Sequence, residues 1–138
     1  MELNDIVAKY NLYLLLTFGS YNTDRFTENS DIDLAYLSNR RLNVEEEMEL
    51  LKDMVVYFKR DGIDLVNLTK ADPLLAFQIA CNSKVLYEEN NSFILFKMKA
   101  SAIYADTKHL RVLRRKFLQE QLKLANYREN KERGIIYE

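Results

Sequence analysis

The sequence contains few of the residues that mark secreted, fibrous or membrane-spanning chains. It has one cysteine, Cys81, so it cannot form an internal disulfide, and this fits a reducing compartment. With one proline and three glycines, it shows no low-complexity linker. No apolar run approaches about 20 residues, and no basic-then-apolar leader opens the chain. We therefore expect no membrane span and a cytoplasmic location.

No sign of charge dominates either. The formal net charge is -1, so no global field favours nucleic acid, and no basic surface interleaved with aromatics is evident. We expect no direct nucleic-acid binding. The 138 residues, 48% apolar and 30% charged, indicate an ordinary globular chain with one core. Cys81 is expected to be a small buried hydrophobe on a helix.

Hydrophobic patterning predicts a small mixed β-sheet covered by helices, α/β or α+β by class. We assign residues 1–125 to one domain and residues 126–138 to a tail that is flexible or contacts a partner. Predicted strands cover 12–18, 31–37, 63–68 and, at an edge, 84–88; predicted helices cover 2–10, 44–60, 73–81 and about 92–125.

Two helical patterns give specific expectations. In helix 44–60, five apolar residues at steps of three and four predict one inward face, and Gly62 is placed to end the helix. In the last helix, apolar residues every seven positions predict a stripe packed on the sheet or on another helix. The first set is Val44, Met48, Leu51, Val55 and Phe58, and the second is Phe96, Ile103, Leu110, Phe117 and Leu124.

Three aspartates lie in or beside strands that are otherwise apolar. Asp31 and Asp33 are two residues apart, so in a strand they share one face, and Asp64 lies on strand 63–68. If that strand lies beside strand 31–37, the three carboxylates converge. Carboxylates so close repel one another, and a divalent cation removes the conflict. Oxygen ligands favour Mg²⁺ or Mn²⁺.

A Gly-Ser turn precedes the aspartates. Gly19 ends the apolar run 12–18, and glycine can adopt positive φ and lets other groups approach its backbone. The backbone N–H groups of such a turn bind phosphate, and the Ser20 hydroxyl adds a donor. Metal ligands beside a phosphate cradle indicate a nucleoside triphosphate substrate and nucleotidyl transfer, in which pyrophosphate leaves.

Gly19-Ser20, ten residues, and then Asp31-Ile32-Asp33 resemble the GS-x10-DxD motif of the DNA polymerase β-like nucleotidyltransferases, with Asp64 similar to their third carboxylate. The chain length and the C-terminal YADTKHLRVLRRKFLQEQL helix resemble the minimal nucleotidyltransferases (MNT), in particular the MntA-type antitoxins paired with HEPN ribonuclease toxins. The likeness covers most of residues 1–125.

The resemblance implies a fold, an activity and a partner. Such enzymes transfer AMP from ATP, with Mg²⁺, to a tyrosine of a HEPN toxin, silencing it, so a hetero-oligomer with that toxin is implied. Asp31 and Asp33 would then hold the metals, Asp64 would bind the catalytic metal and help deprotonate the acceptor, and Gly19 and Ser20 would hold the triphosphate.

Some residues leave choices open. Lys108 and Arg111 share a helix face with Tyr104 and are candidates for nucleotide phosphates, with surface solvation as the alternative. Asn22 and Asp24 depart from the residues that many relatives have in the loop. They support one alternative function, an antitoxin that acts by binding alone. A nucleotidyltransferase for small molecules is a second alternative, although such relatives usually carry a larger second domain.

Overall fold

The computed structural model describes residues 2–132 and residue 134. The elements follow one another along the chain as α1 (Leu3–Tyr10), β1 (Leu12–Phe18), a 3-10 turn η1 (Gly19–Asn22), β2 (Ile32–Ser38), α2 (Val44–Phe58), β3 (Ile63–Asn67), α3 (Pro73–Cys81), β4 (Lys84–Glu88), α4 (Ser92–Asp106) and α5 (Lys108–Glu132). The predicted mixed sheet with helices is confirmed. Ile135 and Ile136, in the predicted tail, lie outside the described residues.

The four strands form one mixed sheet in the order β3-β2-β1-β4. β1 pairs antiparallel with both β2 and β4, whereas β2 and β3 run parallel. The parallel pair is possible because α2 crosses over between its two strands. β4 is an edge strand, as predicted, and β3 forms the other edge.

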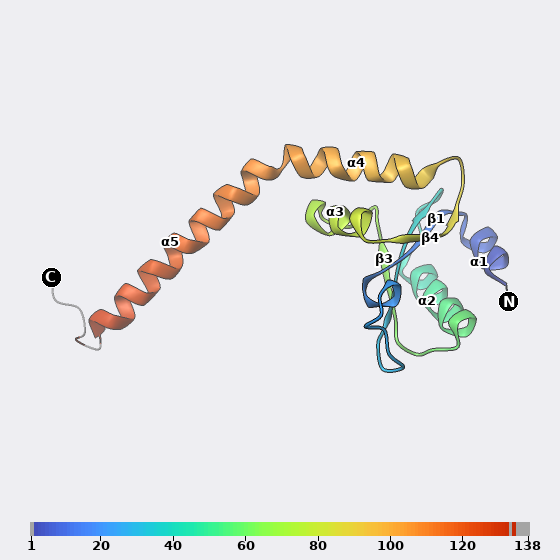
Figure 1. Ribbon diagram of the computed structural model, residues 1–138, viewed down its shortest axis with the longest axis horizontal. Helices are drawn as coiled ribbons and strands as arrows, with labels where there is room; N and C mark the ends of the chain where they lie inside the picture. Colours follow the sequence, from blue (N-terminus) through green and yellow to red (C-terminus); the bar gives the residue numbers. More distant parts are fainter. Residues whose placement is uncertain (1, 133, 135–138) are drawn as a thin grey trace. The chain divides into compact units, whose positions relative to one another are not determined.

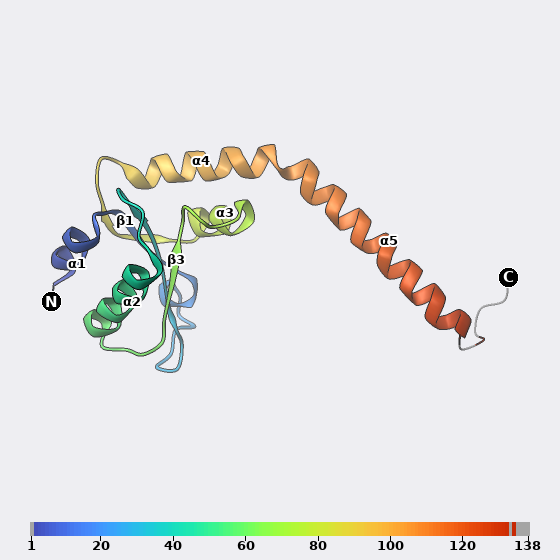
Figure 2. The same cartoon turned by 180° about the vertical axis from the view of Figure 1, so that it is seen from behind.

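Helices cover both faces of the sheet (Figure 1). α1 and α2 enclose one core layer, which includes Leu15, Leu34 and Tyr36. α3 and the first part of α4 enclose the other, which includes Leu16, Ala35 and Phe96. The view from behind shows the same separation of α2 from α3 by the strands (Figure 2). Because β1 and β2 are buried on both faces, they are nearly continuous apolar runs.

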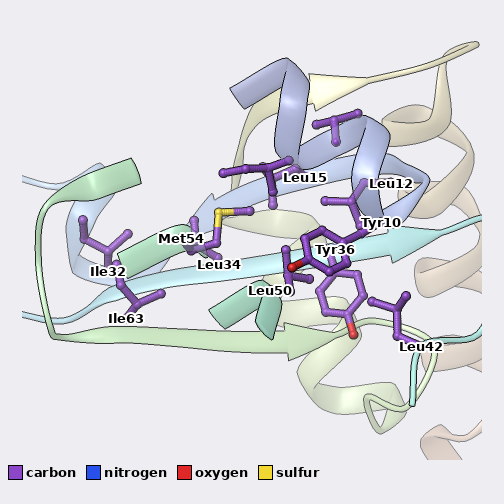
Figure 3. Packing of buried hydrophobic residues seen from close by; sticks show 12 residues of the cluster. Tyr10, Leu12, Leu15, Ile32, Leu34, Tyr36, Leu42, Leu50, Met54 and Ile63 are labelled. Atoms are coloured by element: carbon purple, nitrogen blue, oxygen red, sulfur yellow. The ribbon is translucent and has the colours of Figure 1, made fainter. Parts of the chain in front are cut away.

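The buried face of α2 is centred on other residues than predicted. Leu50 and Met54 are fully buried and point into the cluster that contains Leu15 and Leu34 (Figure 3). Val44 and Met48 are 70% and 57% exposed, so their assignment to the core was wrong. The apolar residues of α2 cover two adjacent stripes of the helix, and the sheet selects the one that faces it.

The end of α2 also differs from the prediction. Lys59 takes the left-handed conformation that ends the helix, with φ of 56°, so Gly62 does not perform this role. Cys81 was expected to be buried but is exposed, because it is the last residue of α3 and follows the buried pair Ile79 and Ala80.

The long C-terminal helix is two helices. α4 ends at Asp106 and α5 begins at Lys108, and Thr107 between them donates its hydroxyl hydrogen bond back to the carbonyl of Ile103 at 2.9 Å. Such back-bonding bends helices. α5 extends to Glu132, beyond the predicted helix end near residue 125.

The chain divides into two compact units, residues up to Ala102 and residues from Ile103 onwards. Of the predicted seven-residue stripe, Phe96 is buried in the first unit, and α5 has no buried residue along its length. The domain boundary at residue 125 stays a prediction. Among the described residues, no helix is both long and apolar enough to cross a membrane.

Candidate active site

The parallel pairing of β2 and β3 brings the predicted aspartates together. Asp33 on β2 and Asp64 on β3 are partners in the strand register, and Asp31 immediately precedes β2. Residues at matching positions of neighbouring strands project to the same face. The expected neighbourhood of strands 63–68 and 31–37 is thus confirmed.

Asp33 is the central carboxylate of the three. It is half-buried, whereas Asp31 and Asp64 are exposed. Burial raises the pKa of Asp33 above its ordinary value, and the carboxylate of Asp64, through its charge and through hydrogen bonding, and the charge of Asp31 raise that pKa further. The ionisation of Asp33 therefore depends on both neighbouring carboxylates, and positive charge at this point would favour its ionised form.

The donor set fits a hard divalent cation. Three carboxylates supply only oxygen, the ligand that Mg²⁺ and Mn²⁺ prefer, and their mutual repulsion is the unfavourable term that a cation removes. Within residues 2–132 and 134, no three acidic, histidine or cysteine side chains already stand in the geometry of a complete metal cluster. Asp33 interacts with Asp31 and with Asp64 as two separate pairs of carboxylates. That these aspartates hold a metal stays a prediction.

The Gly19-Ser20 turn lies directly against Asp33. Gly19 has φ of +72°, and it opens the 3-10 turn Gly19–Asn22. A Cβ at Gly19 would overlap Oδ2 of Asp33 and stand 3.3 Å from its Cγ. Only glycine combines this backbone conformation with this approach. The predicted phosphate-binding turn and the predicted metal ligands are therefore adjacent in space.

Asn22, one of the departures from the family pattern, fixes the turn to β1. The Thr17 hydroxyl donates to Oδ1 of Asn22 at 2.8 Å, and Nδ2 of Asn22 donates to the Thr17 carbonyl at 2.8 Å. Thr17 is buried, so Asn22 satisfies a polar group that would otherwise lack a partner. Asp24, the other departure, is exposed.

Gly62 is a site residue that the sequence reading assigned to another role. A Cβ at Gly62 would overlap Oδ1 of Asp31, and the Gly62 carbonyl accepts from the N–H of Ile32 at 2.8 Å. A glycine directly before an apolar strand that carries a carboxylate was the available signal. Gly19 and Gly62 thus each make room for one of the aspartates.

Arg60 is a second residue that the sequence reading missed, because its position suggested only a charge after a helix. Its Nη2 donates to the carbonyls of Thr27, Glu28 and Ser30 at 3.2, 2.6 and 2.8 Å. Its guanidinium carbon lies 4.6 Å from the centroid of the Phe26 ring. Arg60 thereby fixes the segment that leads into Asp31 to the end of α2.

Lys108 and Arg111 belong to the second unit. Arg111 binds the end of α4, because its guanidinium donates to the Tyr104 carbonyl at 2.6 Å and to the Thr107 hydroxyl at 2.5 Å. It also stacks on the Tyr104 ring at 3.6 Å from the centroid. Nucleotide binding by Lys108 and Arg111 stays a prediction.

A mixed sheet with an aspartate pair, a third aspartate on the neighbouring parallel strand and an adjacent Gly-Ser turn defines a nucleotidyltransferase. Residues 1–92 match the family described as polymerase beta, nucleotidyltransferase. The chain belongs to this family.

The similarity extends to particular members. The chain is 30% identical over 118 residues to the protein adenylyltransferase MntA of Shewanella oneidensis, a match that covers 86% of this chain and 81% of that one. It is 26% identical to a chain of a toxin–antitoxin crystal structure with AMP-PNP (TM-score 0.71, 87% of this chain and 95% of that one). It is 27% identical to a chain in a structure of tri-AMPylated Shewanella oneidensis HEPN toxin with MNT antitoxin (TM-score 0.64, 87% and 89%).

Proposed function

We propose that this chain is an antitoxin that transfers AMP from ATP to a tyrosine of a HEPN-domain toxin and thereby inactivates it. The contact of the Gly19 turn with Asp33, beside Asp64, carries the proposal, because it puts a phosphate-binding turn next to carboxylates. The similarity to MntA, and to a structure in which the toxin is AMPylated, supports the choice of a protein acceptor. The reaction would take place in the cytoplasm, within a complex of the two proteins.

The proposed step is a displacement at the α-phosphorus of ATP. The tyrosine oxygen forms a bond to that phosphorus, the bond from phosphorus to the bridging oxygen of the β-phosphate breaks, and pyrophosphate leaves. Asp64, exposed at its edge strand, takes the proton of the hydroxyl. The N–H groups of the turn and the Ser20 hydroxyl hold the phosphates.

Asp31, Asp33 and Asp64 would hold Mg²⁺. The ion, when bound, stabilises the negative charge that develops on the phosphate oxygens. The raised pKa of Asp33 fits this role, since a bound cation returns the carboxyl to its ionised form.

Labelled ATP tests the proposal. The purified chain is incubated with Mg²⁺, labelled ATP and its cognate HEPN-domain protein, and label is expected on a tyrosine of that protein. Asp33→Asn is expected to lower the rate by about 10³-fold or more, since several kcal/mol of charge stabilisation are lost. If wild type and Asp33→Asn leave the partner equally unlabelled, the chain is not an adenylyltransferase for it.

An antitoxin that acts by binding alone is the alternative. Its argument was the unusual loop, and Asn22 proves to hold that loop in place. An Asp31→Asn/Asp33→Asn double variant separates the two functions. Rescue of growth against the toxin by this variant would show that binding suffices.

A further inference from the structure

A groove with a volume of about 340 Å³ lies between the first half of α2 and the edge strand β3. One wall is apolar and comes from α2, with Val44, Met48 and Leu51. The other comes from β3 and includes Asp64 and Leu65. The groove therefore runs along the strand that carries Asp64, whose carboxylate, by alternation with Ile63 and Leu65, lies on the other face of β3.

The apolar wall is not covered by the core of its own unit. Val44, Met48 and Leu51 follow one another at steps of four and three, so they form one stripe, yet Val44 and Met48 are largely exposed. Val44 and Met48 are the residues that the sequence pattern placed in the core. An exposed apolar stripe that lines a groove is typical of a surface that binds a partner.

The opposite wall is an unpaired strand edge. β3 ends the sheet, and in the described part of the chain no strand pairs with its outer side. Ile32 donates to the Gly62 carbonyl, and Leu68 donates to the Tyr36 carbonyl, so the backbone groups of even-numbered residues point towards β2. By alternation, the backbone groups of Leu65 point outwards, where an extended segment can pair with them.

The charges of the groove oppose a nucleic acid. Its lining contains Asp64 and Glu47, and the cation beside them, Lys70, already forms an ion pair with Glu47 at 3.0 Å. Asn67 and Tyr36 also donate hydrogen bonds to Glu47, so the carboxylate of Glu47 has its partners within the chain. Among the residues that the structure describes, the lining of the groove contains no cation, so it does not attract phosphates, and Asp64 adds negative charge at the same strand edge.

We propose that this groove binds the acceptor segment of the partner protein as an added strand along β3. The segment is extended, so its side chains alternate between the two faces of the sheet. Those on one face pack on Val44 and Met48, and the tyrosine on the other face presents its hydroxyl at Asp64. Three residue steps separate Asp64 from Asn67, about 10 Å of strand, which matches a short stretch of polypeptide. The assignment rests on the proposed adenylyl transfer and names the surface that recognises its substrate.

The test compares two charged substitutions on the same helix. Met48→Glu puts a charge on the apolar wall, whereas Val56→Glu, at a residue that is 64% exposed and does not line the groove, is the matched control. Because both positions are exposed, both variants fold. The measurements are the KM for the HEPN protein, the KM for ATP and kcat.

Met48→Glu is expected to raise the KM for the HEPN protein about tenfold or more and to leave the KM for ATP and kcat within about twofold. Val56→Glu is expected to behave as wild type. If the wild type labels the partner and Met48→Glu shows an unchanged KM, or if Val56→Glu raises it equally, the groove is not the acceptor site while the proposed function stands. If the wild type fails to label the partner, both proposals fall.

Discussion

Three glycine-to-alanine variants separate backbone strain from steric overlap at the active site. Gly19 has positive φ and faces Asp33, and Gly62 faces Asp31 without positive φ. Gly134 has φ of +70°, and no atom of the residues that the structure describes lies within 4 Å of its missing Cβ. Gly19→Ala therefore combines strain and overlap, Gly62→Ala has overlap alone, and Gly134→Ala has strain alone. All three variants add the same methyl group, but the physical cause of the expected effect differs between them.

The size of each effect follows from these contacts. An alanine in the left-handed region costs about 1–2 kcal/mol. A methyl group that overlaps Oδ2 of Asp33 forces the carboxylate to move by about 1 Å, and a misplacement of this size costs about 10²-fold in rate. For Gly19→Ala we expect a melting temperature lower by about 3–8 °C and AMP transfer slower by about 10²-fold. Gly62→Ala should slow AMP transfer because it displaces Asp31, and it should lower stability less than Gly19→Ala does.

Three measurements check this prediction. Circular dichroism gives the melting temperature, and the initial rate with labelled ATP and the HEPN protein gives the transfer. Titration with Mn²⁺ reports the carboxylates without the acceptor, and Gly19→Ala should weaken Mn²⁺ binding whereas Gly134→Ala should not. A folded Gly19→Ala with wild-type transfer and Mn²⁺ affinity, or a Gly134→Ala that is equally impaired, would refute the reasoning.

Three other predictions concern single side chains. Asn22→Ala leaves the buried Thr17 hydroxyl unpaired, so urea denaturation should show about 1–3 kcal/mol lower stability; an unchanged midpoint would contradict this. Arg60→Met removes the donor that three loop carbonyls share and should cost about 1–2 kcal/mol in the same assay; an unchanged midpoint would contradict this. The folded state raises the pKa of Asp33, so ionisation of Asp33 lowers stability as pH rises. Without divalent ions, Asp33→Asn should therefore have a higher melting temperature than wild type at pH 7, and this difference should shrink towards pH 4. A difference in melting temperature that is independent of pH would exclude this cause.

The local features of the fold could be read from the sequence because they depend on neighbouring residues. β1, α3 and β4 have the predicted bounds, since a continuous apolar run, an Asp-Pro helix start and a short strand are local signals. The buried face of α2 was not local in this sense. Its apolar residues form two stripes, and the contact with β1 and β2 selects the stripe that contains Leu50 and Met54.

The candidate site also has a part that the local sequence predicts and a part that only the structure shows. The motif residues Gly19, Ser20, Asp31 and Asp33 are close in the chain, so their spacing alone predicted a phosphate turn beside metal ligands. The part that Gly62 plays at Asp31 is a contact between segments 31 residues apart. Its local signal, a glycine before an apolar strand that carries a carboxylate, also fits the end of a helix. The clamp of Arg60 on the loop carbonyls is hidden for the same reason.

The sequence by itself predicted the chemistry of this protein, because the residue types and their spacing are typical of a phosphate-binding turn, an aspartate pair and a third carboxylate on an apolar strand. Only the tertiary structure decided the register that places Asp64 beside Asp33, and the exposure of Val44 and Met48 along β3. Register and exposure arise from the packing of α2 on one face of the sheet, beside the parallel pair β2 and β3. That packing is a property of the whole sheet and not of any one segment.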